Sequence, residues 1–443
     1  MTQTVAERRS PATPRRPTQR ATHWVLFGSL ASGIGAFAFT TLGARVLGEA
    51  AYQPIAVLWT IQYLAGTIVL FSAEAFVARA LQNGEGTGLD RSVRVIGVWV
   101  AAFAALTGLV TYLLRAPLFH GDGHLAFAAA LLIASYAGFF LIKGRMAGTN
   151  RFRSYGAATA LESLGRILIA VPVLALLPTT GALGWVMPLG PALVVAWWLY
   201  DRGRALPPDP VSADEIAPAT AGAGSFLAAT TAANAVSQTL LAAGPLVLLP
   251  LGATPREVSG FFVVVTAARV PLVFAIGGLL SRLLPPLTRL ARAGDDPMLR
   301  RIALLTVPAT IAVALVAAVA AWFAGVPIVS AIFAITRPDR VFVVLTVFGV
   351  MLATGSLLLN QILIARGSEH RLVLPWLAAL VVAALTVVLA PGTPTLRVSV
   401  AFTAGEVVAL LGLLGAVLSA PALVRTPGER VPVTAAPPPV AEP

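Results

Sequence analysis

The sequence contains no cysteine and unusually little charge. Without cysteine the chain has no disulfide, no thiolate metal ligand and no thiol nucleophile. Charged residues make up 11% of the chain and hydrophobic residues 57%, whereas a soluble domain averages roughly 25% charged residues. Such a chain has too few charges to cover a water-facing surface. The composition therefore indicates an integral membrane protein.

Long apolar runs divide the sequence into membrane-spanning segments. A helix needs about 20 mainly apolar residues to cross a bilayer. The first segment is too long for a cleaved signal and follows a tail, so we predict that it spans the membrane. The predicted fold class is all-α, a polytopic membrane protein with about 12 transmembrane helices. The segments lie at residues 23–44, 54–79, 93–114, 124–143, 156–177, 183–200, 224–250, 260–284, 302–324, 341–364, 372–390 and 398–419.

One long polar break divides these segments six and six. It covers residues 201–223 and is rich in Pro, Ala and Gly, which is typical of a flexible linker. We therefore expect two six-helix lobes, residues 23–200 and 224–424, a plan that is common among secondary transporters. A basic tail at residues 1–22 and a Pro-rich tail at residues 425–443 are predicted to be disordered.

The two predicted lobes share a local pattern. The stretch LGEAAYQPIAVLWTIQYLAG begins at Leu47, and LGATPREVSGFFVVVTAARV begins at Leu251. In each, a short turn after Leu-Gly leads into a long span, so the pattern favours an internal repeat.

Basic residues fall mostly on one side of the predicted spans. Of the 31 Lys and Arg residues, 23 lie on the side of the N-terminus and six on the other side. Because positive charge is enriched in cytoplasmic segments, we expect both termini to be cytoplasmic in the cell membrane. We therefore attribute the net charge of +12 to basic residues that orient the chain in the membrane, and we expect no nucleic-acid partner.

No enzyme signature is present in the sequence. A P-loop motif is absent, and the longest predicted outer connection, residues 326–340, is too short for the catalytic domain of a glycosyltransferase or ligase. His120, Asp122 and His124 lie in HGDGH, which we interpret as a glycine turn rather than a metal site. We therefore expect no enzyme activity, no cofactor and no metal.

A sparse set of polar residues remains inside the predicted spans. Glu162 and Arg166 are four residues apart on one helical face, so they are predicted to neutralise each other. Asn234 and Gln238 have the same spacing, which suits either interhelical hydrogen bonds or the wall of a polar cavity. The remaining candidates for ion coupling or ion pairing are the acids Glu74, near Arg79, and Glu406, which has no local cation.

Arg269 is the deepest basic residue without a local partner. It lies about nine residues into the eighth segment, roughly 14 Å deep at the helical rise, and Pro271 removes a helical hydrogen bond beside it. Intramembrane charges usually face a bundle interior or a cavity. We therefore expect its partner to be either one of the three glutamates or an anionic substrate, because guanidinium pairs bidentately with phosphate.

Three stretches resemble a known family. They are GARVLGEAAYQ after the first span, LIKGRMAGTNRFRSYGAATALESLGRILIA around the fifth, and AARVPLVFAIGGLLSRLLPPLTRLARAGD around the eighth. Together they are similar to the multidrug/oligosaccharidyl-lipid/polysaccharide (MOP) exporter superfamily, and within it to Wzx-like oligosaccharide flippases. The first span lacks the aspartate of many cation-coupled drug exporters, and the two extra C-terminal spans of the lipid II flippase group are missing.

This resemblance implies a transporter for a polyprenyl-diphosphate-linked oligosaccharide, used in surface polysaccharide biosynthesis. It implies that Arg45 and Arg269 contact the diphosphate in a central cavity, with Arg166 as a third arginine by position. The implied partners are the lipid-linked substrate, membrane lipids and other polysaccharide assembly proteins, and the implied state is a monomer. The alternatives are a cation-coupled multidrug antiporter of the same superfamily and a membrane-embedded polysaccharide ligase.

Overall fold

The computed structural model describes residues 19–82, 86–149, 151–201, 223–270 and 281–421. In these ranges the regular structure is helical and contains no strand. Most of the two predicted tails and the predicted linker lie outside the described residues, as does Pro271. The first helix begins at Gln19, so the last residues of the predicted N-terminal tail are helical, because the first span extends past its apolar core.

The first half of the chain forms a group of helices that we call the N lobe. Its helices are α1 (Gln19–Leu47), α2 (Glu49–Ala65), the π-helical turn η1 (Gly66–Leu70), α3 (Phe71–Gln82), α4 (Gly86–Leu113), α5 (Arg115–Phe119), α6 (Gly123–Gly148), α7 (Phe152–Leu176) and α8 (Thr180–Asp201).

The second half forms the group that we call the C lobe. It contains α9 (Ala223–Ala242), α10 (Gly244–Leu248), α11 (Pro255–Ala268), α13 (Ser281–Arg292), α14 (Asp296–Ala320), the π-helical turn η4 (Ala321–Gly325), α15 (Val326–Phe333), α16 (Arg340–Ala365), the short 3-10 helix η5 (Glu369–Leu372), α17 (Val373–Leu389) and α18 (Pro394–Leu418).

The twelve predicted spans are mainly helical wherever the chain is described. Nine helical stretches of the described residues are long and apolar enough to cross a membrane. The predicted span at 93–114 lies almost entirely within α4 (Gly86–Leu113), and its part Gly97–Leu113 is a further apolar helical stretch. The span at 224–250 is interrupted at Ala243, between α9 and α10, and the span at 260–284 runs through residues outside the described ranges. The chain is a multi-pass, all-α membrane protein.

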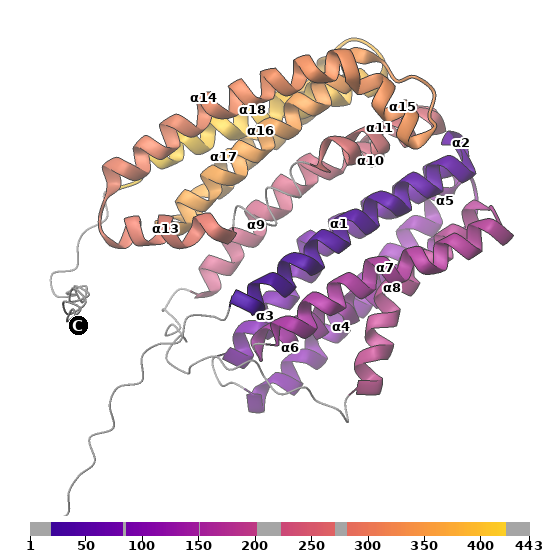
Figure 1. Ribbon diagram of the computed structural model, residues 1–443, viewed down its shortest axis with the longest axis horizontal. Helices are drawn as coiled ribbons and strands as arrows, with labels where there is room; N and C mark the ends of the chain where they lie inside the picture. Colours follow the sequence, from indigo (N-terminus) through magenta and orange to yellow (C-terminus); the bar gives the residue numbers. More distant parts are fainter. Residues whose placement is uncertain (1–18, 83–85, 150, 202–222, 271–280, 422–443) are drawn as a thin grey trace, which may run out of the picture.

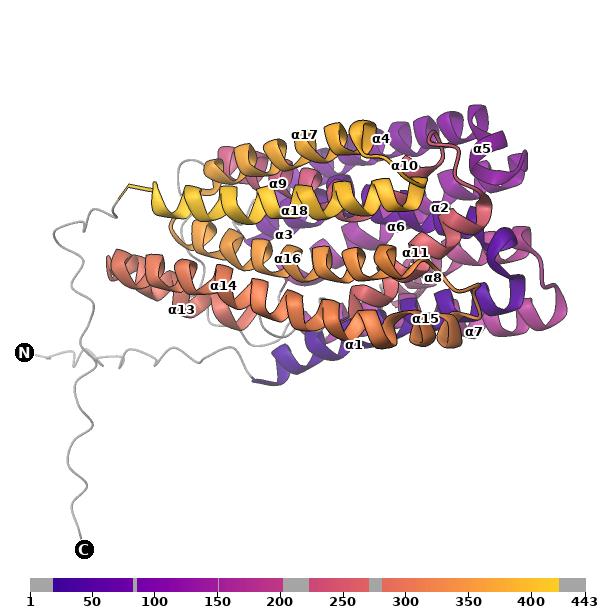
Figure 2. The ribbon, with the colours of Figure 1, turned by 90° about the horizontal axis from the view of Figure 1, so that it is seen from above.

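The two lobes lie next to each other, and most of their helices run roughly along the long axis of the molecule (Figure 1). Helices pack mainly within their own lobe, with α1 against α7 and α6 against α8 in one, and α16 and α17 against α18 in the other. Both described chain ends, the start of α1 and the end of α18, lie at the end of the bundle opposite α15 (Figures 1 and 2). The end that carries α15 is called the α15 end below.

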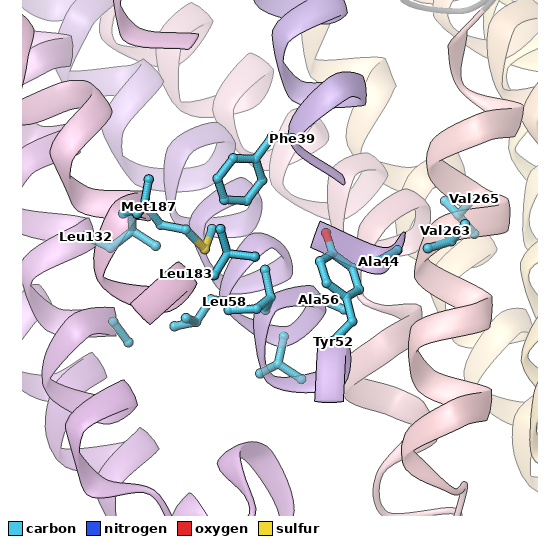
Figure 3. Packing of buried hydrophobic residues seen from close by; sticks show 14 of the residues in the cluster. Phe39, Ala44, Tyr52, Ala56, Leu58, Leu132, Leu183, Met187, Val263 and Val265 are labelled. Atoms are coloured by element: carbon cyan, nitrogen blue, oxygen red, sulfur yellow. The ribbon is translucent and has the colours of Figure 1, made fainter. Parts of the chain in front are cut away.

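The lobes meet through α2 and α11 and, near the α15 end, through α1 and α15. Figure 3 shows this junction: Tyr52 and Ala56 of α2 belong to the same buried cluster as Val263 and Val265 of α11. A second cluster, around Trp376, fills the C lobe between α14, α16, α17 and α18. A continuous apolar contact therefore holds the N lobe to α11.

The glycine of the repeated Leu-Gly pattern has a positive φ in both lobes. Gly48 precedes α2 with a φ of 79°, and Gly252 precedes α11 with a φ of 77°. Residues with a side chain rarely adopt this left-handed region. The two glycines thus turn the chain into the two helices that form the junction.

Helices α1 and α7 approach each other through a glycine contact. A methyl group on Gly156 would lie 2.1 Å from the carbonyl oxygen of Trp24, and one on Gly28 would lie 2.5 Å from the carbonyl oxygen of Gly156. Small residues allow this close packing in membranes, where helix association depends on van der Waals contact.

Candidate functional site

A cavity of about 280 Å³ lies between the two lobes. Its walls come from α1 and α2 of the N lobe and from α9, α10 and α11 of the C lobe, and they are mainly apolar and aromatic. Among the described residues that line it, Arg269 is the charged one and no carboxylate is present. Transporters built from two lobes place substrates at such an interface, so this cavity is the candidate site.

Arg269 stands at the C-terminal end of α11. Its backbone N–H still donates to the Val265 carbonyl at 3.0 Å, but the helix ends at Ala268, three residues before the position of Pro271 in the sequence. The guanidinium lies over the Tyr63 ring, 5.4 Å from its centroid. Within the described part of the chain its Nε and Nη2 atoms have no hydrogen-bond partner. A buried guanidinium whose Nε and Nη2 atoms have no protein acceptor can donate hydrogen bonds to a bound anion.

Tyr63 also connects the two lobes directly. Its hydroxyl group donates a hydrogen bond of 3.0 Å to Oε1 of Gln238 on α9. Gln238 therefore makes an interhelical hydrogen bond beside the cavity, one of the two roles that its position suggested. Asn234 lies one turn away on α9 and is half-buried. Its backbone carbonyl oxygen accepts a hydrogen bond of 3.0 Å from the Ser237 hydroxyl.

Glu406 is buried in α18 of the C lobe, with 1% of its surface exposed. Its Oε2 atom has no hydrogen-bond partner among the described residues. The groups that act on the carboxylate are the Ser356 hydroxyl of α16 and, through its charge, Arg269. Among the three candidate glutamates, Glu406 is therefore the one whose charge interacts with the charge of Arg269.

Glu162 and Arg166 form a buried ion pair on α7, as their spacing predicts. The Tyr136 hydroxyl contacts both side chains, and the Ser163 hydroxyl donates to Glu162 at 2.6 Å. The Arg166 guanidinium lies 4.7 Å from the centre of Trp59, which lines the cavity.

Arg166 itself does not line the cavity. Its guanidinium is committed to Glu162 and Tyr136, and only 2% of the residue is exposed. The role of a third diphosphate-binding arginine thus stays a prediction, and in this arrangement its direct effect is to support Trp59.

Glu74 has a cation that sequence spacing did not suggest. Lys143, the single lysine of the chain, lies 3.5 Å from its carboxylate, and the Tyr155 hydroxyl donates to it at 2.8 Å. The side chain of Arg79, the neighbour expected from the sequence, lies outside the described part. In the sequence, the one signal for this ion pair is that the single lysine lies at the end of the predicted span 124–143.

Arg45 lies at the α15 end and not in the cavity. Its Nε atom donates to the carbonyl of Ile332 at 2.6 Å and its Nη2 atom to that of Ala331, so it caps the last turn of α15. Beside it the Thr336 hydroxyl donates to Glu49 at 2.6 Å. These bonds join the lobes at this end, and the contact of Arg45 with a diphosphate stays a prediction.

The HGDGH segment forms a turn. Asp122 caps α6 by accepting a hydrogen bond of 2.8 Å from the backbone N–H of His124, and His120 adopts a left-handed backbone conformation. In the described ranges no group of three or more His, Cys, Asp or Glu residues is arranged to hold a metal ion.

Neither a family model nor a curated protein matches the sequence. Solved structures match over nearly the whole chain. A mutant of the Vibrio cholerae MATE transporter VcmN has a TM-score of 0.56 at 15% identity, covering 90% of this chain and 95% of that one. The same transporter in its bent form gives 0.52 at 16% identity, covering 90% and 96%. A further MATE structure in the bent conformation gives 0.51 at 16%, covering 90% and 93%.

These structures are transporters, and MATE transporters belong to the MOP superfamily. At such identities the similarity is one of fold. It agrees with the superfamily that the three stretches resemble, while the Wzx-like branch stays a prediction. The chain therefore has the fold of the MATE transporters, with the cavity between its lobes lined by one unpaired arginine.

Proposed function

We propose that the protein is a flippase that moves a polyprenyl-diphosphate-linked oligosaccharide from the cytoplasmic to the outer leaflet. The observation that carries this proposal is Arg269, a buried guanidinium with two free nitrogen atoms in the wall of the cavity between the lobes. The diphosphate would accept hydrogen bonds from this group, since guanidinium and phosphate match in geometry and charge.

The character of the cavity supports an anionic amphiphile over a cationic drug. No carboxylate occurs among the described lining residues, and an arginine repels a cation. Phe37, Trp59 and Phe262 give the rest of the wall an apolar, aromatic surface, which suits the apolar part of a lipid near its head group. The sugar would extend from the head group towards water when the lobes open.

Transport would occur by alternating access of the two lobes. The hydrogen bonds of Arg45 and Thr336 close the α15 end, which the distribution of basic residues predicts to be the outer end. Moving negative charge outward is favoured by an inside-negative potential, by about 2.3 kcal/mol per charge per 100 mV. The membrane potential can therefore drive this step.

The test replaces Arg269 in cells. Deletion of the protein should leave lipid-linked oligosaccharide on the cytoplasmic leaflet, and Arg269→Ala should reproduce the deletion at normal protein levels. The matched control is Arg256→Ala, which removes an exposed arginine from the first turn of α11 and should complement the deletion. Normal surface glycan in the Arg269→Ala strain would contradict the proposal.

A cation-coupled multidrug antiporter is the second candidate, and the buried carboxylate of Glu406 is the observation that favours it. Such a protein would depend on a titrating acid rather than on the arginine. In vesicles it would show drug-stimulated proton flux that is lost in Glu406→Gln and kept in Arg269→Ala, the reverse of the result expected for a flippase.

A further inference from the structure

Glu406 differs from the buried glutamates Glu74 and Glu162. Glu74 has Lys143 at 3.5 Å, and Glu162 has Arg166 on the same helix. Glu406 is equally buried, yet in the described ranges it forms no direct ion pair and one of its oxygens has no hydrogen-bond partner. Burial of a carboxylate is costly unless a cation or a proton compensates its charge.

Helix α11, which carries Arg269 at its C-terminal end, packs against α16 and α18. Ala268, the neighbour of Arg269, packs in one buried cluster with Ala353 of α16 and Phe402 of α18. Phe402 lies one helical turn before Glu406. Arg269 and Glu406 each act on the charge of the other without direct contact.

Among the described residues, the remaining surroundings of Glu406 supply no second cation. On α16 the group that acts on the carboxylate is the Ser356 hydroxyl, a neutral hydrogen-bond donor. From α9 and α17, Leu240 and the Ala379 backbone lie against the adjacent Gly405. Among the described groups that act on Glu406, Arg269 is the charged one, so a change in the charge of Arg269 should change the free energy of the Glu406 carboxylate.

An anion bound to Arg269 would cancel the positive charge that compensates Glu406. The carboxylate would then be buried without a counter-charge, and uptake of a proton would restore neutrality. We propose that Glu406 controls anion binding at Arg269, so that each phosphate-type head group binds together with one proton taken up by the Glu406 carboxylate. This inference rests on the proposed function, because it assumes that Arg269 binds an anionic substrate.

Reciprocal linkage gives the proposal a measurable consequence. If anion binding favours protonation of Glu406, protonation of Glu406 must favour anion binding by the same factor. Affinity should therefore fall as the pH rises through the ionisation of Glu406, towards a limit of about tenfold per pH unit for one linked proton. Glu406→Gln, which is permanently neutral and has nearly the same shape, should bind the anion with high affinity at every pH.

The experiment uses the full-length protein in lipid nanodiscs, with farnesyl diphosphate as a short polyprenyl diphosphate and empty nanodiscs as the blank. Calorimetric titrations between pH 7 and 9, in buffers of different ionisation enthalpy, count the protons exchanged on binding. The wild type should take up about one proton more than Glu406→Gln. Because the ligand is the same in both titrations, the protons that it exchanges itself cancel in this difference.

Two further variants make the result specific. Glu406→Asp keeps the acid and should keep the proton uptake, whereas Glu369→Gln removes a glutamate from η5, in the loop between α16 and α17, and should behave as the wild type. Elution profile and thermal unfolding establish that each variant is folded.

The outcomes separate this inference from the proposed function. An equal proton count and an equal pH dependence in the wild type and in folded Glu406→Gln would overturn the role of Glu406. That result would leave the flippase proposal standing if Arg269→Gln still abolished binding. Absence of farnesyl diphosphate binding by the wild type, or binding that is unaffected by Arg269→Gln, would instead overturn the proposed function and this inference with it.

Discussion

Arg45 provides a direct test of how the two lobes are held together. The guanidinium of this N-lobe residue donates to the carbonyls of Ile332 and Ala331 at the end of α15 in the C lobe. A hydrogen bond to a charged group contributes about 1.5–3 kcal/mol when buried, and solvent exposure lowers this value. Since Arg45 is exposed, we assign about 2 kcal/mol to the two bonds together.

Removing this contribution in Arg45→Ala should favour separation of the lobes at the α15 end by roughly 30-fold, since each 1.4 kcal/mol is a factor of ten. The absence of native cysteine allows spin labels to be placed at only two sites, with Ala50→Cys on the N lobe and Arg337→Cys on the C lobe. Both residues are exposed. Pulsed electron paramagnetic resonance in nanodiscs then measures the distance between the labels.

The wild type should show one dominant short distance, and Arg45→Ala should show a second, longer distance. The matched control is Arg115→Ala, because Arg115 donates to the Tyr112 carbonyl within its own lobe and should leave the distribution unchanged. If folded Arg45→Ala gives the same distribution as the wild type, the bonds to α15 do not hold this end closed and the reasoning is wrong.

Three other predictions concern stability. Glu162→Gln leaves the buried Arg166 without a counter-charge and should lower the unfolding free energy by about 3–5 kcal/mol, while the double variant with Arg166→Met should recover most of the loss; an equal loss in both would contradict this account. Gly156→Ala should cost about 1–3 kcal/mol through overpacking of α1 against α7, whereas Gly415→Ala, which meets nothing within 4 Å, should be neutral in the same denaturation assay. Tyr63→Phe removes one hydrogen bond between the lobes and should cost about 1 kcal/mol; it should retain ligand binding because the ring over Arg269 remains.

Part of the candidate site followed from local sequence. The Glu162–Arg166 pair could be predicted because residues four apart on a helix lie on the same face. The depth of Arg269 could be read from its distance along an apolar segment. The ion pair was confirmed because helix geometry alone places its two groups, whatever surrounds them, while the depth of Arg269 in a membrane stays a prediction.

Other partners could not be predicted because they depend on which helices are neighbours. Lys143 reaches Glu74 from α6, and Arg45 reaches α15 from the other lobe. In both cases the partners are far apart in the sequence, and no periodic pattern links them. Family resemblance assigned Arg45 to the cavity, but packing of the lobes places it at the α15 end.

The sequence by itself determined that the chain crosses the membrane many times as helices, because scarce charge and long apolar runs leave no other stable state in a bilayer. It also singled out Arg269. Only the tertiary structure decided what surrounds Arg269, because the cavity walls, the Tyr63 ring and the Glu406 carboxylate come from separate helices. The energy of a buried charge depends on what lies within a few ångströms of it, and that neighbourhood exists only in the folded chain.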